Sequence, residues 1–177
     1  MRYKKLIEID IDLLTQCLIR TKDNKIVKTE VKEINTQHYN FKDWEFNWIE
    51  ESKKRNKILG LFAENDKRLQ GIVEYYENKE RQLLEVVLVE IAPFNNRHNP
   101  KNFLKSKEYL GVGGHLFAEI ARISFEKGYD GYVSFLAKTN LIEHYKKTLG
   151  AKQLSYIEMY IDDEAAMKLV KKYYGKY

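Results

Sequence analysis

A run of glycines in the second half of the chain restricts its fold more than any other feature. Gly111, Gly113 and Gly114 fall within four positions, directly before a helix pattern in which Leu116 and Ile120 share one face. Glycine lacks a Cβ atom and permits close backbone approach, and a helix N-terminus offers unpaired N–H groups and a positive dipole end to an anion. The stretch therefore predicts a cradle for a pyrophosphate group.

Two common glycine fingerprints do not fit this stretch. A dinucleotide-binding loop needs G-x-G-x-x-G in the tight turn after a strand, whereas the spacing here is G-x-G-G and the preceding predicted strand ends at Ala92. A P-loop ends in Gly-Lys-Ser/Thr, but His115-Leu116 follows the glycines here. The order of the remaining elements therefore decides between phosphate-binding folds.

Hydrophobic periodicity predicts a mixture of strands and helices. Alternation or short apolar runs predict extended segments at 7–12, 13–20, 25–34, 58–63, 69–76, 82–92, 132–137 and 154–161. Helical spacing predicts helices within 37–54, from the glycines to Gly128, at 140–149, and after a cap at Asp162 or Asp163. We expect a hairpin around 21–24 and an antiparallel meander over 58–92 that ends at Pro93.

Charge and cysteine content limit the classes of partner and compartment. The formal net charge of +5 favours an anionic partner, although the charges are dispersed along the chain. The single cysteine excludes an intramolecular disulfide. The apolar run 86–89 is too short to span a membrane, and no signal-peptide pattern follows the basic start. We therefore expect a cytoplasmic protein with no membrane partner.

The order of elements and the glycine run together resemble the GNAT acyltransferase superfamily. Its members share a signature near Arg/Gln-x-x-Gly-x-Gly/Ala, whose loop amides bind the pyrophosphate of acetyl-CoA. Gly111-Val112-Gly113 matches the glycine part, and Gly114-His115-Leu116-Phe117 matches the start of the following helix. The resemblance implies cofactor contacts at Gly111, Val112, Gly113, Gly114 and His115.

Two further stretches carry the resemblance. Residues 89–93 look like the family strand whose backbone pairs with pantetheine, and 140–151 looks like the second segment on the cofactor side. The resemblance implies that the N–H group of Ile91 or Ala92 polarises the thioester carbonyl. It also implies that Tyr145 protonates the departing thiolate. Asn140 is expected to cap its helix and to touch the pantetheine.

The chain departs from the family pattern at three places. Glu108 stands at the Arg/Gln position, where Lys105 or Lys107 would have to supply the positive charge, unless Glu108 points away. The connection 94–110 is longer than usual. Tyr145 lies five residues before Gly150, where four is commoner in the family.

Glu85 and Glu90 are the candidate general bases. Their parity along the strand differs, so only one of them faces a given side of the sheet. Each has a structural alternative as a solvated strand carboxylate, and a base acting through water or an amine that is already neutral would need neither. Tyr145 has the alternative of an amphipathic core residue, and His115 that of a packed or exposed side chain. The other histidines show no metal-ligand spacing, so we predict no metal site.

These observations predict one α/β (α+β) domain over residues 1–177, with a mixed, mostly antiparallel sheet flanked by helices. The resemblance implies acetyl-CoA in a V-shaped opening between the fourth and fifth core strands, and acetyl transfer to an amine by direct attack. A non-catalytic acyl-CoA-binding regulatory protein and a basic nucleic-acid-binding module are the alternatives. The acceptor class and oligomeric state stay open, with a homodimer as the superfamily's expectation.

Overall fold

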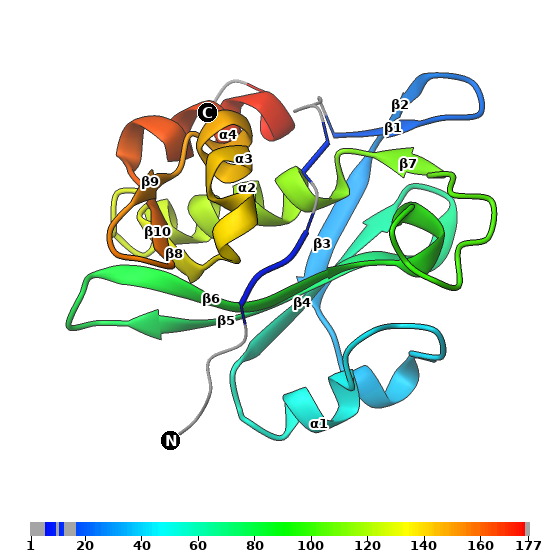
Figure 1. Ribbon diagram of the computed structural model, residues 1–177, viewed down its shortest axis with the longest axis horizontal. Helices are drawn as coiled ribbons and strands as arrows, with labels where there is room; N and C mark the ends of the chain where they lie inside the picture. Colours follow the sequence, from blue (N-terminus) through cyan, green and yellow to red (C-terminus); the bar gives the residue numbers. More distant parts are fainter. Residues whose placement is uncertain (1–5, 10, 13–16, 176–177) are drawn as a thin grey trace.

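A seven-stranded mixed sheet lies at the centre of the molecule (Figure 1). The computed structural model describes residues 6–9, 11–12 and 17–175. In spatial order the sheet consists of β3 (Thr29–Glu33), β4 (Lys57–Ala63), β5 (Asp66–Asn78), β6 (Leu83–Ile91), β8 (Val133–Leu136), β10 (Glu158–Ile161) and β9 (Lys152–Gln153). All neighbours are antiparallel except β6 and β8, which are parallel. The sheet confirms the predicted mixed, mostly antiparallel fold class.

Helices cover both faces of this sheet (Figure 1). Helix α2 (Val112–Glu126) packs on β5, β6 and the C-terminal helix α4 (Asp163–Tyr174), and α3 (Ile142–Leu149) adds its apolar side to the same core. A second core lies under the short helix α1 (Trp48–Ser52) and contains Trp48, Ile58, Ile72 and Leu88. Among the described residues, no helix has the length and apolar character needed to cross a membrane.

A smaller sheet lies next to the start of α2 (Figure 1). It has the order β2-β1-β7, with β1 (Leu18–Arg20) paired antiparallel to both β2 (Lys25–Val27) and β7 (Tyr109–Leu110). The β1–β2 pair confirms the predicted hairpin around 21–24. The short β7 was not predicted, and it places the residue before Gly111 in a strand.

The predicted helix within 37–54 is wrong for most of its length. The chain there has a 3-10 helix (Thr36–His38) and α1, with an irregular segment between them. Asp43 adopts a positive φ of 72°, and the Glu45 and Phe46 N–H groups donate to the Glu90 carboxylate instead of to a helical carbonyl. The aromatic side chains do form a packing surface, as expected, because Phe41, Trp44 and Phe46 pack against the core under α1.

Most other boundaries agree with the sequence predictions. Strands β4, β5, β6 and β8 lie within two or three residues of the predicted bounds. Of the strand predicted at 154–161, only Glu158–Ile161 is a strand (β10); β9 lies just before the predicted bounds, and residues 154–157 connect the two strands. Asp162 caps α4 by accepting the Ala165 N–H group at 3.0 Å, as predicted. Part of the strand predicted at 13–20, residues 13–16, lies outside the described residues.

Candidate functional site

The fourth and fifth strands of the large sheet separate toward their C-terminal ends. Strands β6 and β8 are in register only at Leu84–Val133 and Glu85–Ser134. Beyond this point β6 pairs with β5 alone, as far as Ile91. The gap between β6 and β8 past Glu85 and Ser134, which we call the opening, lies between the fourth and fifth strands, where the resemblance implies one.

An extended piece of the chain itself lies along this opening (Figure 1). It comprises the described residues 6–9 and 11–12, which we call the N-terminal segment. The Ile7 N–H donates to the Leu136 carbonyl at 2.6 Å, and the Lys138 N–H donates to the Ile7 carbonyl at 3.4 Å. Ile7, Ile9 and Ile11 are buried in the larger core. The alternation seen in the sequence therefore reflects a strand-like segment bonded to β8.

Tyr145 points into the opening from α3 and holds the N-terminal segment. Its hydroxyl oxygen accepts the Ile9 N–H at 3.1 Å, and it lies 3.2 Å from the Ile7 carbonyl and 3.1 Å from the Ile9 carbonyl. The side chain is fully buried and its ring packs edge-on against Phe135, with 5.4 Å between the centroids. The partners of the predicted acid are thus peptide groups of the N-terminal segment.

The glycine run begins α2 at the mouth of the opening. Gly111 is the N-cap residue with a φ of 91°, and its N–H donates to the Asp12 carboxylate at 3.3 Å. A Cβ atom at Gly113 would lie 2.9 Å from Ile11 Cδ1 and 3.2 Å from Ile9 Cδ1. Glycine at 113 therefore allows the N-terminal segment to pack directly on the first turn of α2, and the acidic end of the segment reaches the cradle.

The charged side chain next to the glycine run is that of Lys107, and the Glu108 side chain points elsewhere. The Lys107 ammonium forms an ion pair with Asp12, and both side chains are largely buried. Glu108 instead pairs with Arg68, at 2.6 Å between Oε2 and Nη2. The Glu108 carboxylate is therefore turned to Arg68, and the positive charge next to the Gly111 amide is that of Lys107, which shares Asp12 with it.

Only one of the two predicted thioester-polarising groups faces the opening. The Ala92 N–H donates to the Gln70 carbonyl at 2.9 Å, on the β5 side. Backbone N–H groups alternate between the two sides of a strand, so the Ile91 N–H is directed toward the opening. Of the pair, Ile91 has the orientation required for that task.

Glu90 is buried on the α1 face and is surrounded by N–H donors. It accepts from the Glu45 N–H at 2.6 Å, the Trp48 Nε1–H at 2.7 Å and the Phe46 N–H at 3.4 Å. Burial raises the pKa of the Glu90 carboxyl, and the three donors oppose that rise. These three hydrogen bonds connect residues 45–48 to strand β6. Sequence reasoning missed it because the partners are more than forty residues apart.

Glu85 lies at the closed end of the opening, opposite Ser134. Its carboxylate accepts hydrogen bonds from the Tyr76 hydroxyl, from Asn78 Nδ2 at 2.6 Å and from Arg81. The structure therefore places the two candidate bases in separate polar clusters and does not bring either of them together with Tyr145.

His115 and Asn140 differ from their expected positions. His115 is fully buried, with Nε2 2.7 Å from the Thr29 hydroxyl and its ring against Tyr173 and Tyr174. Burial lowers the pKa of His115 to about 4, so the packed alternative describes this side chain. Asn140 does not cap α3, because the N-cap residue is Leu141 and no side-chain cap bond forms.

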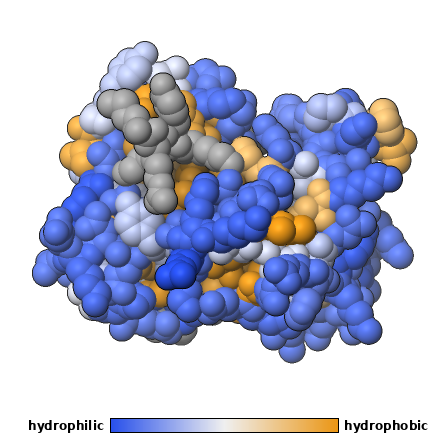
Figure 2. Space-filling view, turned by 90° about the horizontal axis from the view of Figure 1, so that it is seen from below, coloured by the Kyte–Doolittle hydropathy of each residue, from blue (hydrophilic) through white to orange (hydrophobic). Residues whose placement is uncertain are grey.

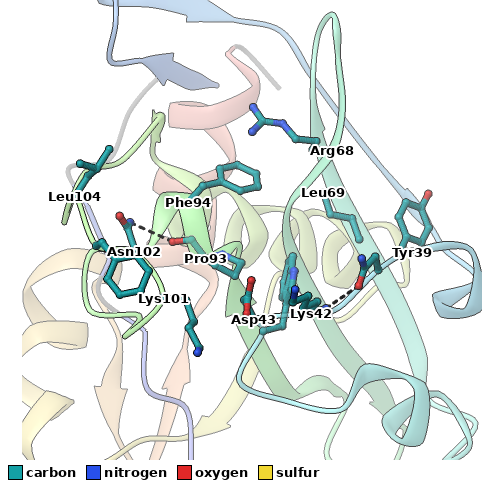
Figure 3. A pocket seen from close by; sticks show the side chains of 13 residues that line it. Tyr39, Lys42, Asp43, Arg68, Leu69, Pro93, Phe94, Lys101, Asn102 and Leu104 are labelled. Atoms are coloured by element: carbon teal, nitrogen blue, oxygen red, sulfur yellow. Dashed lines mark hydrogen bonds between the residues drawn. The ribbon is translucent and has the colours of Figure 1, made fainter.

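Two cavities share Trp44 in their lining, and one of them adjoins the opening. One, of about 840 Å³, is lined by Ile9, Ile91, Asn140 and His144 together with polar residues of the 95–101 loop. The other, of about 660 Å³, is lined by Tyr39, Lys42, Phe94 and Lys101 among others (Figure 3). Viewed from below, the surface is mostly hydrophilic, and apolar side chains show only in separate areas (Figure 2). Both cavities suit a small ligand better than a broad apolar partner.

Comparisons with known proteins give distant structural likenesses. No family model matches the chain, and no curated protein sequence matches it. A crystal structure of a bacterial toxin has 12% identity and a TM-score of 0.53, covering 86% of this chain and 100% of that one. A Bacillus subtilis acetyltransferase in complex with CoA has 14% identity and a TM-score of 0.47, covering 77% of this chain and 98% of that one. Apo FdhC, a nucleotide-linked sugar GNAT, has 11% identity and a TM-score of 0.46, covering 90% and 94%.

Proposed function

We propose that this chain, which has a GNAT-like fold, is an acyltransferase that moves an acetyl group from acetyl-CoA to an amine by direct transfer. One observation carries the proposal. The opening between β6 and β8 holds an extended chain whose peptide groups bond to β8 and Tyr145 and whose carboxylate reaches the first amide of α2.

The chemistry of this occupant matches the order of groups along CoA. A CoA molecule has a thiol, then two amides, then a pyrophosphate. In the opening, the amide-binding groups are β8 and Tyr145, and the anion-binding groups are the Gly111 N–H and Lys107. A helix N-terminus with a nearby cation is a suitable site for phosphate oxygens. The opening therefore presents polar partners in the sequence that pantetheine and pyrophosphate would need.

Seven of the predicted site residues have a role in this proposal. The first-turn amides of Gly111, Val112, Gly113 and Gly114 bind the pyrophosphate, and the region of Asn140 borders the pantetheine. The Ile91 N–H stabilises the negative charge that develops on the thioester oxygen. Tyr145 donates a proton to the thiolate as it leaves. The 840 Å³ cavity beside Ile91 is where the amine acceptor binds.

The proposal assigns Glu90 and Glu85 to hydrogen bonding within the fold rather than to proton abstraction. Both carboxylates are occupied by several donors, and Glu90 faces the α1 side. Attack on the thioester then requires an amine that is neutral when it binds or that loses its proton through water. This requirement predicts activity that rises with pH up to the pKa of the acceptor amine.

A second candidate function is an acyl-CoA-binding regulatory protein without turnover. The observation that favours it is the engagement of the Tyr145 hydroxyl with backbone groups of Ile7 and Ile9. If the hydroxyl keeps these partners when CoA is present, it has no proton to give to a thiolate. Binding without release of CoA from acetyl-CoA would be the corresponding result.

The test is calorimetric titration of the full chain with acetyl-CoA and with CoA, followed by a free-thiol assay with a panel of amines. Binding by wild type and loss of binding in Gly113→Asp are expected, because the new carboxylate repels the pyrophosphate. Gly128→Asp adds the same charge where a Cβ meets nothing within 4 Å; because its φ of +79° strains any side chain, the fold of both variants is verified by circular dichroism before titration. Equal binding by wild type and Gly113→Asp would refute the cradle.

A further inference from the structure

The N-terminal segment and acyl-CoA would need the same space. The segment bonds to β8 through Ile7, contacts the Tyr145 hydroxyl through Ile7 and Ile9, and reaches the Gly111 amide through Asp12. Its isoleucines pack directly on the first turn of α2, where a Cβ atom at Gly113 would lie 2.9 Å from Ile11 Cδ1 and 3.2 Å from Ile9 Cδ1. Resting on the function proposed above, we infer that the N-terminal segment is an intramolecular competitor of acyl-CoA, in which Asp12 takes the place of the pyrophosphate.

Lys107 is the group that would exchange one anionic partner, the Asp12 carboxylate, for another, the pyrophosphate of CoA. Only 9% of the Lys107 side chain and 12% of the Asp12 side chain are exposed. Among the described ion pairs, Asp12 is the sole acidic partner of Lys107. When the segment leaves, Lys107 is left beside the Gly111 N–H without its counter-charge, and a largely buried charge is costly unless it is paired. The vacated site therefore selects an anion, and Lys107 becomes the phosphate-binding residue.

The three isoleucines determine how firmly the competitor is held. Ile7, Ile9 and Ile11 are between 1% and 6% exposed, so the segment gains apolar contacts that CoA must replace. The affinity measured for CoA is then the intrinsic affinity multiplied by the fraction of molecules with the segment displaced. A change that weakens the segment without touching the cradle must consequently tighten CoA binding.

Two full-length variants test this competition by calorimetry with CoA. Ile9→Ala removes apolar contacts of the segment and leaves the charges of the cradle unchanged. Asp12→Asn removes the competing carboxylate. Both should lower the Kd for CoA, by about three- to tenfold if the displaced fraction rises in proportion. Lys107→Met, alone or combined with Asp12→Asn, should raise the Kd.

Matched controls come from the β1–β2 hairpin. Ile26→Ala truncates an isoleucine that is 59% exposed, and Asp23→Asn removes a carboxylate that is paired with Arg20. Neither should change the Kd for CoA. Similar gains in the controls and in the segment variants would overturn the inference.

Hydrogen exchange separates displacement from a purely electrostatic gain. Addition of CoA to the wild-type chain should increase amide exchange at residues 7, 9 and 11. If CoA binds while the protection of these amides is unchanged, the competition is refuted and the proposed function stands. If neither wild type nor the Ile9→Ala and Asp12→Asn variants bind CoA, the proposed function fails, and this inference fails with it.

Discussion

The Tyr145 hydroxyl oxygen accepts a hydrogen bond from the Ile9 N–H at 3.1 Å, although the two residues are 136 positions apart in the chain. This bond connects α3 to the N-terminal segment at the residue that we propose as the proton donor of acyl transfer. The proposed function therefore gives Tyr145 two tasks that can be measured separately, one in stability and one in turnover.

Tyr145→Phe should lower the free energy of unfolding by about 1–3 kcal/mol, because the buried Ile9 N–H loses its acceptor. It should also lower kcat while lowering the KM for acetyl-CoA, since a weaker segment competes less well. Urea unfolding and steady-state kinetics check both effects. Tyr156→Phe, at a residue that is 79% exposed, is the control. An unchanged kcat would assign Tyr145 to structure alone.

Glu90→Gln should destabilise the protein by about 1–3 kcal/mol, because an amide nitrogen would face N–H donors that now meet a carboxylate oxygen. The pH profile of kcat should keep its shape, since the proposal gives Glu90 no proton to transfer. Glu50→Gln, at an exposed position on α1, should change stability little. Loss of a titration step from the kcat profile of Glu90→Gln would show instead that Glu90 is the base.

Because of Glu74, the free energy of unfolding should decrease as the pH rises. The side chain is fully buried on the α1 side, where Asn56 Nδ2 donates to it at 2.7 Å. Burial, with a smaller effect from Glu51, raises the pKa of Glu74 above its ordinary 4.5. A raised folded-state pKa stabilises below the unfolded pKa, and this stability is lost as pH rises through the folded value. Glu74→Gln should therefore flatten the decline above pH 4.5, as measured by urea unfolding across pH; an identical slope in the variant contradicts the assignment.

Because of His115, the free energy of unfolding should decrease as the pH falls. Burial lowers the pKa of His115 from 6.5 to about 4. Between these two values the imidazole is protonated in the unfolded chain and neutral in the folded chain. Stability is consequently lost as pH falls from 6.5 toward 4, by up to roughly 3 kcal/mol for a shift of this size. His115→Gln, which keeps a hydrogen-bonding partner for the Thr29 hydroxyl, should remove this loss. The check is the difference in unfolding free energy between wild type and variant at pH 7 and pH 4.5.

The glycine run and the meander were predictable from the sequence because both depend on local patterns. Gly111 begins α2, and the alternation and turn residues over 58–92 determine β4, β5 and β6. The irregular segment before α1 was not predictable, since the Glu90 carboxylate captures its N–H groups from another part of the chain.

The strand to which the N-terminal segment bonds was likewise not predictable from the sequence. The alternation of Ile7, Ile9 and Ile11 with acidic residues indicates a strand, but periodicity does not say which strand it joins. The signal that bears on its location is the glycine at 113, because a residue without a Cβ atom lets Ile11 and Ile9 pack on the first turn of α2. The same lack of a Cβ atom is what a phosphate cradle would require, so the sequence alone does not distinguish the two uses of this glycine.

The bond between Ile9 and Tyr145 also has a consequence for the order of events during synthesis. Residues 7 and 9 leave the ribosome long before β8 and α3, to which they bond, have been made. Contacts of such long sequence separation carry the highest loop-closure cost and are expected to form late. We expect every newly made molecule to pass through a period in which the sheet is formed and the opening is vacant. A small molecule present during that period would meet its site before the N-terminal strand arrives, so the first occupant of a nascent chain is decided by kinetics rather than by affinity.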